Sequence, residues 1–289
     1  MVGVYERKRS GAAIWCQRFA IFLIPYFLLV IILYRLNNIE TGQLFALIAL
    51  GFALCMLALV LAIRASYDLW TKGYKGGKAT VRGLIVTLIV LLPFLYYGYL
   101  GLLHPLANDI STDPFDPPSY INASTTRLEF VHKGMNPIEA YGRDYAETIV
   151  AAYPKVRSRR YPAGAERVLE AVQFILSENE WKVTGTLGVP EADPNSELED
   201  NVSNNDDNQS VDEGLEAPDD IYVEAVETTL VFGFENDVVI RIVSEAENTL
   251  VDLRSSSRWG EHDFGHNAQL IESFLGQLDI ALLGIAGEG

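Results

Sequence analysis

The polar residues best suited to chemistry are concentrated near the C-terminal end of the chain, in residues 230–268. Arginine side chains there could bind phosphate or carboxylate through paired hydrogen bonds. They precede a predicted helix start, where free backbone amides favour an anion. The pattern indicates an anion- or headgroup-binding pocket that could also bind a partner. Its candidate residues are Arg241, Asp252, Arg254, Arg258, Asp263 and Asn267.

The same residues also fit a purely structural network. Asp263 is placed to cap the helix N-terminus, where its carboxylate would itself occupy the anionic position. Arg254 and Arg258 could pair with nearby carboxylates, namely Asp237, Asp252 or Asp263. Because ion-pair networks commonly resemble functional sites, the sequence leaves both interpretations open.

Two further patterns near this cluster are weaker. His262 and His266 have a four-residue spacing that can chelate zinc on a helix, but His262 precedes the predicted helix start and no Cys or third His is nearby. We therefore predict neither a metal site nor a cofactor. The serines at 255–257 lack a Gly-x-Ser-x-Gly elbow and an evident base. We predict that these serines have structural roles, and we assign no catalytic residue.

These residues lie on a predicted β-hairpin whose register can be argued. Matching apolar positions across the two strands fixes the pairing. It leaves residues 245–248 as a four-residue loop, a length that hairpins use. The predicted cross-strand pairs are Ile242–Val251, Ile240–Leu253, Val239–Arg254 and Arg241–Asp252. The last pair joins opposite charges and is expected to contribute modestly, ~0.2–1 kcal/mol.

Around this hairpin, periodicity predicts three helices and four strands. The helices are expected over residues 138–153, 163–178 and 264–278, and the strands over 180–186, 221–232, 237–244 and 249–255. Strands joined by short links are antiparallel. The predicted fold class is therefore a soluble α+β domain, an antiparallel sheet with helices packed on one face, behind N-terminal transmembrane α-helices.

Charge and apolarity divide the 289-residue chain into two parts. Residues 1–103 contain ten Lys and Arg against three Asp and Glu, whereas residues 104–289 contain twelve against thirty-five. In the first part, residues 14–34, 44–63 and 83–103 are apolar enough to span a bilayer, which requires ~20 residues. They contain no Asp, Glu, Lys or His of the kind that marks ion pathways, so we interpret them as an anchor.

The distribution of basic residues predicts the topology. Basic residues cluster before the first span and between the second and third. The positive-inside rule places both segments in the cytoplasm, and three spans then place the soluble domain on the far side. We therefore expect a multi-pass protein of the inner (cell) membrane with a periplasmic domain. Its expected partners are the lipid bilayer and an envelope protein or small anionic ligand. The acidic soluble part argues against nucleic acid.

Linkers complete the expected domain organisation. Residues 104–135 are rich in proline and predict an extended, solvated arm. The soluble domain is expected over residues 136–280, followed by a tail at 281–289. Inside it, residues 190–220 hold twelve acidic and no basic residues, and such a segment is expected to be disordered.

The soluble part resembles the bacterial and plastid family known as domain of unknown function 1499. The resemblance covers most of residues 108–280. It rests on these stretches: Asn108-Asp109, Thr112-Asp113-Pro114, Asn136-Pro137, Tyr153-Pro154, Trp181, Val223-Glu224-Ala225, Gly233-Phe234, Asp237 to Arg241, Val251 to Ser255, Ser257-Arg258, Gly260, Asp263, Gly265 and Asn267-Ala268. The chain departs from the family pattern at Asn236, at Trp259 and in its longer acidic insertion. The family has no established activity, so the resemblance supports the fold and implies no reaction.

The sequence therefore favours an extracytoplasmic, non-enzymatic binding or scaffold domain on a membrane anchor. Two alternatives remain: a hydrolase-type enzyme that uses the Arg/Asp/Ser cluster, and a structural subunit of a membrane complex.

Overall fold

A computed structural model of the chain describes residues 7–122, 142–188 and 220–283. The chain divides into two compact units, the first built around residues 1–103 and the second comprising most of the remainder.

The first unit is a bundle of three helices, α1 (Gly11–Arg35), α2 (Thr41–Lys72) and α3 (Gly77–Leu103). All three are long and apolar enough to cross a membrane, as the sequence predicts. Small residues allow the helices to approach closely: Gly51 of α2 lies directly against the ring of Phe27. Such contacts are typical of membrane helices, which gain stability from close packing more than from burial of apolar surface.

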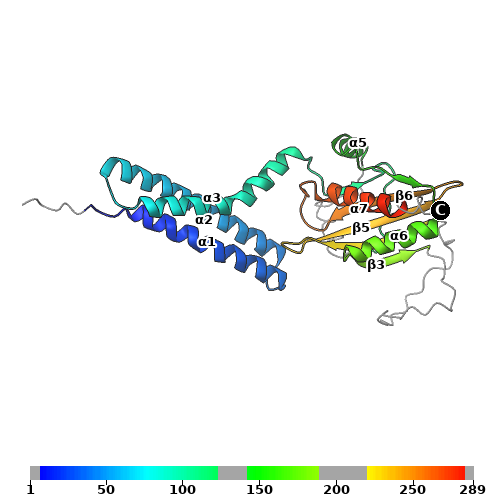
Figure 1. Cartoon of the computed structure of the whole chain (residues 1–289), viewed down its shortest axis with the longest axis horizontal. Coiled ribbons are helices and arrows are strands. Elements are labelled where there is room, and N and C mark those ends of the chain that lie inside the picture. The colour runs from blue at the N-terminus through cyan, green and yellow to red at the C-terminus, as the bar shows by residue number, and fades with distance from the viewer. Residues whose placement is uncertain (1–6, 123–141, 189–219, 284–289) are drawn as a thin grey trace, which may run out of the picture. The chain divides into compact units, whose positions relative to one another are not determined.

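The second unit is built on an antiparallel sheet in the order β1-β6-β5-β4-β3, and a further short strand, β2, also pairs with β6 (Figure 1). The strands are β1 (Asp109–Ser111), β2 (Arg159–Tyr161), β3 (Lys182–Leu187), β4 (Ile221–Thr228), β5 (Glu235–Ser244) and β6 (Thr249–Ser257). The predicted hairpin is the β5–β6 pair at the centre of this sheet.

The structure confirms the predicted register of this hairpin. Ile242 is paired with Val251, and Arg241 with Asp252, as expected from apolar matching. The strands β1 and β2 were not predicted. Each has only three residues, too few to show an alternating pattern, and each is specified by pairing with β6.

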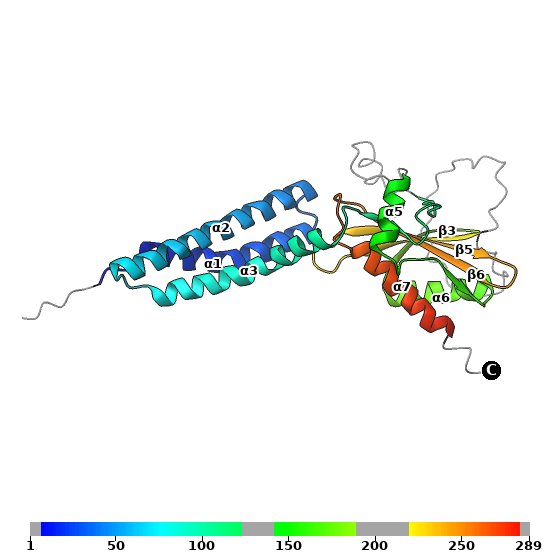
Figure 2. The ribbon, with the colours of Figure 1, turned by 90° about the horizontal axis from the view of Figure 1, so that it is seen from above.

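Helices α6 (Ala165–Glu178) and α7 (His266–Leu283) lie on the same face of the sheet, whereas α5 (Arg143–Ala152) lies apart from them (Figure 2). The core is formed where α6 and α7 meet β5 and β6. This arrangement confirms the α+β class. Helix α7 begins at His266, two residues later than predicted, because Phe264 and Gly265 have φ angles of 56° and 81°, which an α-helix cannot contain.

The proline-rich arm differs from expectation. We predicted a solvated segment, but Asn108, Asp109 and Thr112 are buried, and β1 pairs with β6. The residues that follow, up to Asn122, lie along the sheet face opposite α6 and α7, where they bond to β4, β5 and β6. Burial is possible because these polar groups find partners there. The rest of the predicted arm, and the acidic insertion apart from Asp220, lie outside the described residues.

Candidate functional site

The structure does not bring the six candidate residues together. Side chains alternate between the two faces of a strand, so Arg241, Asp252 and Arg254 point away from α6 and α7 and toward the arm. Asp263 and Asn267 lie on the other side, at the start of α7, where Asn267 accepts a hydrogen bond from Ser255. The candidates therefore form two separate polar networks.

Arg254 is the most deeply buried of the arginines. Arg254 is 3% exposed, and its guanidinium lies against the fully buried Asp109. Its Nε and Nη2 donate to the two Asp109 carboxylate oxygens at 3.0 and 2.8 Å. Its Nη1 donates to the Pro118 carbonyl at 3.1 Å, and the guanidinium lies 4.8 Å from the centre of the Tyr120 ring. One side chain thus fastens β1, the arm and β6 together.

Arg241 and Arg258 are paired in the same way. Arg241 donates to Asp252 on the neighbouring strand and to Asp116 in the arm, each at 2.9 Å. Arg258 donates to the buried carboxylate of Asp237 at 2.7 Å. All three candidate arginines are therefore matched by carboxylates of the same chain. The structural interpretation anticipated the Arg258–Asp237 pair, and the hairpin register anticipated Arg241–Asp252. Arg254 instead pairs with Asp109, which was not among the carboxylates expected for it.

Glu224 fixes the end of the arm. This carboxylate on β4 is 2% exposed, and it accepts the backbone amides of Ile121 and Asn122, both at 2.8 Å. These two hydrogen bonds favour the charged form of the carboxylate and tie the end of the arm to β4. The sequence does not reveal this role of Glu224, because the groups that it accepts are backbone amides, which no residue pattern indicates.

The second network organises the start of α7. Asp263 accepts the amides of Gly265 and Asn267 at 2.8 and 3.0 Å. It therefore caps the start of α7 with its side chain, although it lies two residues before the N-cap position and not at it as predicted, because α7 begins at His266. Burial raises the pKa of Asp263, and the hydrogen bonds from these two amides oppose that shift. Asn267 accepts from the Ser255 hydroxyl at 2.7 Å and donates to the Asn108 carbonyl at 3.0 Å. This network joins helix, sheet and arm.

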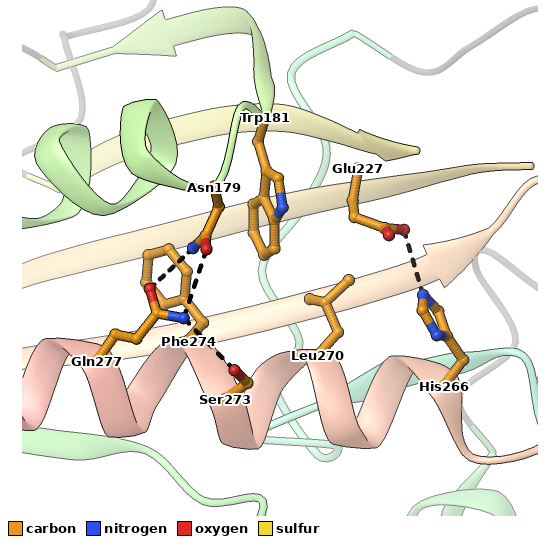
Figure 3. A pocket seen from close by; sticks show the side chains of 8 residues that line it. All are labelled: Asn179, Trp181, Glu227, His266, Leu270, Ser273, Phe274 and Gln277. Atoms are coloured by element: carbon orange, nitrogen blue, oxygen red, sulfur yellow. Dashed lines mark hydrogen bonds and ion pairs between the residues drawn. The ribbon is translucent and has the colours of Figure 1, made fainter. Parts of the chain in front are cut away.

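A cavity of about 180 Å³ lies beside this network, between α7 and the ends of β3 and β4 (Figure 3). At one end, the His266 imidazole is 3.2 Å from the Glu227 carboxylate. The half-buried Trp181 provides the apolar surface in the middle. Its indole stacks on the buried Phe274 ring at 5.5 Å between centroids, and the buried Leu270 lies beside it.

Paired amides lie at the other end of the cavity. Asn179, just after α6, donates from Nδ2 to Gln277 Oε1 at 2.9 Å. The exposed hydroxyl of Ser273 completes this end. The cavity therefore combines an aromatic surface with hydrogen-bonding groups at both ends, the usual composition of a small-molecule site.

Sequence reasoning missed this cavity, although one signal was present. His266, Leu270, Ser273, Phe274 and Gln277 follow one another at intervals of four, three, one and three residues. This spacing places them on one face of a helix, beside the apolar stripe that packs against the sheet. The partners Glu227, Asn179 and Trp181 are distant in sequence, so only the fold brings them to this face.

The weak metal candidates do not share a site. His262 accepts the Phe264 amide on Nδ1, and its buried Nε2 has no hydrogen-bond partner in the described part of the chain. His266 instead pairs with Glu227. Within residues 7–122, 142–188 and 220–283, no group of three or more His, Cys, Asp or Glu side chains is arranged to hold a metal ion.

The Glu227–His266 pair predicts a pH dependence. The hydrogen bond that His266 makes to the Glu227 carboxylate raises the pKa of His266 above its ordinary value of ~6.5. A raised folded-state pKa means that the pair stabilises the fold fully below about pH 6.5 and loses this effect as pH rises through the folded-state value. We expect the unfolding free energy of the second unit to fall over that range, and to fall less in His266→Gln.

Hydrogen exchange of the β5 and β6 amides, measured on the full chain between about pH 6 and 8.5, reports this stability once corrected for intrinsic exchange rates. Glu227→Gln is the companion variant: it keeps the imidazole but removes its carboxylate partner, so it should reduce the slope as His266→Gln does. Equal slopes in wild type and His266→Gln would contradict the prediction.

Comparison with known proteins places this fold in a family. The model of the family described as "Protein of unknown function (DUF1499)" matches residues 109–278, which is more than half of the chain. The matched region begins at β1 and ends within α7, so it contains the residues that line the cavity and both polar networks apart from Asn108. Neither a curated protein nor a solved structure gives a match. The chain therefore belongs to the DUF1499 family of proteins of unknown function, here with three N-terminal helices able to span a membrane.

Proposed function

We propose that this protein is a membrane-anchored, non-enzymatic binding or scaffold module whose second unit lies outside the cytoplasm and engages an envelope component. The observation that carries the proposal is the pairing of Arg241, Arg254 and Arg258 with buried or arm carboxylates. Charges paired in this way stabilise one conformation of a surface. A catalytic site instead needs groups that can face a substrate.

The location is supported by the basic residues that flank the spans, and it can be tested by labelling. Cysteines would be placed one at a time in a chain whose Cys16 and Cys55 are replaced by Ser. A membrane-impermeant maleimide should label Glu247→Cys, in the exposed β5–β6 loop, in intact spheroplasts. Lys72→Cys, at the end of α2, should react only after permeabilisation. The reverse pattern would contradict an extracytoplasmic domain.

The hydrolase alternative rests on the serines at 255–257, and their contacts favour structural roles. Ser255 donates to Asn267, Ser256 shares a hydrogen bond with Tyr120, and Ser257 donates to Asn236. A nucleophilic serine instead needs a neighbouring base. We expect the full chain to resist a fluorophosphonate probe. Labelling that disappears in Ser255→Ala, Ser256→Ala or Ser257→Ala would favour the hydrolase.

A further inference from the structure

We propose that the cavity between α7 and the ends of β3 and β4 binds a single uncharged saccharide ring. The inference deepens the proposed binding function and rests on it, because it names the chemical class that the module would recognise. It is carried by the combination of an aromatic surface with uncharged and charge-balanced hydrogen-bonding groups (Figure 3).

The aromatic surface suits the apolar face of a sugar. Figure 3 shows the Trp181 side chain between Phe274 on one side and Leu270 and Glu227 on the other. The stack on Phe274 holds the indole in place. The face of an aromatic ring is electron-rich, so it attracts C–H groups polarised by neighbouring oxygens, such as those of a pyranose ring.

The polar groups at the two ends of the cavity can form hydrogen bonds with the hydroxyls of a sugar. Each amide of the Asn179–Gln277 pair has two N–H donors and an acceptor oxygen, so it can bond to its partner and to a ligand hydroxyl together. Glu227 adds acceptor oxygens at the opposite end, where it is already oriented by Asn236 and His266. A hydroxyl both donates and accepts, and a ring that carries several can use both ends of the cavity.

The charge and the volume of the cavity further restrict the class of ligand. None of the described residues that line the cavity is a Lys or Arg, and the Glu227 carboxylate is already paired with the His266 imidazole. A strongly anionic ligand would lack a cationic partner. The volume of about 180 Å³ is smaller than the ~300–1,000 Å³ of sites for drug-sized molecules, which favours one ring over a longer ligand.

The test uses the full chain in lipid nanodiscs and saturation-transfer NMR. The probes are methyl glucoside, methyl galactoside and N-acetylglucosamine, with the disaccharide cellobiose to separate a free sugar from the end of a glycan. Indole and benzoate serve as planar and anionic comparison ligands. We expect saturable transfer to the ring C–H protons of at least one saccharide, with a Kd of about a millimolar.

Variants locate the binding. Trp181→Ala should weaken it about three- to tenfold, and Gln277→Ala should weaken it without loss of the fold. Phe174→Ala removes an exposed aromatic side chain of α6 that does not line the cavity, and it should have no effect. Protection of the β5 and β6 amides from hydrogen exchange verifies that each variant is folded. If Trp181→Ala is unfolded, Gln277→Ala and Asn179→Ala show whether the saccharide binds in the cavity.

Three results would overturn the inference: no saccharide binding up to about 50 mM, binding that is unchanged in all the cavity variants, or binding of indole or benzoate alone. None of these results alters the labelling and fluorophosphonate outcomes, so failure of the saccharide assignment is distinguishable from failure of the proposed function.

Discussion

Arg254→Met is expected to cost the second unit about 3–5 kcal/mol, because it leaves the fully buried carboxylate of Asp109 without its cation. Methionine retains an apolar stem that can pack on Tyr120, so the loss reports mainly the charge and its hydrogen bonds. Hydrogen exchange of the β5 and β6 amides in the full chain should accelerate by about a hundred- to several-thousand-fold.

The matched control is Arg160→Met. Arg160 also forms an ion pair, with Glu245 at 2.9 Å, but its side chain is 57% exposed. Exposed pairs contribute about 0–1 kcal/mol, so exchange should change at most about fivefold. If the two variants lost similar stability, the distinction between the buried network and the surface pair would be wrong.

Asn267→Ala is expected to destabilise the same unit by about 2–4 kcal/mol. The Asn267 side chain is completely buried, and its removal takes the acceptor from the Ser255 hydroxyl and a donor from the Asn108 carbonyl. A buried polar group that loses its partner costs ~1–3 kcal/mol. Because Asn267 joins the start of α7 to the sheet and the arm, exchange should accelerate in α7 and β6 together.

Ser273→Ala provides the comparison on the same helix. Ser273 is exposed and lies two turns farther along α7, and surface substitutions of this kind usually change stability by less than ~0.5 kcal/mol. Acceleration confined to the first turn of α7 in Asn267→Ala would contradict a network that connects helix and sheet.

The sequence specifies the parts of this fold whose determinants are local. Apolar stretches identify the three helices that are able to span a membrane. Apolar matching fixes the β5–β6 register to the residue, because a one-residue slip would expose the core face of each strand. The cap at Asp263 is equally local, since the carboxylate and the amides that it accepts lie within four residues.

Contacts between residues that are distant in sequence could not be predicted from local patterns. The Asp109–Arg254 pair spans 145 residues, and Asp109 lies in a segment whose prolines and aspartates resemble those of a solvated linker. The cavity likewise joins Asn179 to Gln277 and Glu227 to His266, pairs that come together only after α7 docks on the sheet. The residue types at 230–268 indicated polar chemistry. The fold, however, determines which charged side chains pair with one another.

The most direct test of the structural role assigned to the arginines is a double-mutant cycle on Asp109 and Arg254. Unfolding free energies would be obtained by hydrogen exchange for wild type, Asp109→Ala, Arg254→Met and the double variant. If the pair braces arm and sheet, the double variant should be less destabilised than the sum of the single variants, with a coupling of about 2–3 kcal/mol. Effects that add to within about 0.5 kcal/mol would contradict the account and return Arg254 to the group of potential ligand-binding residues.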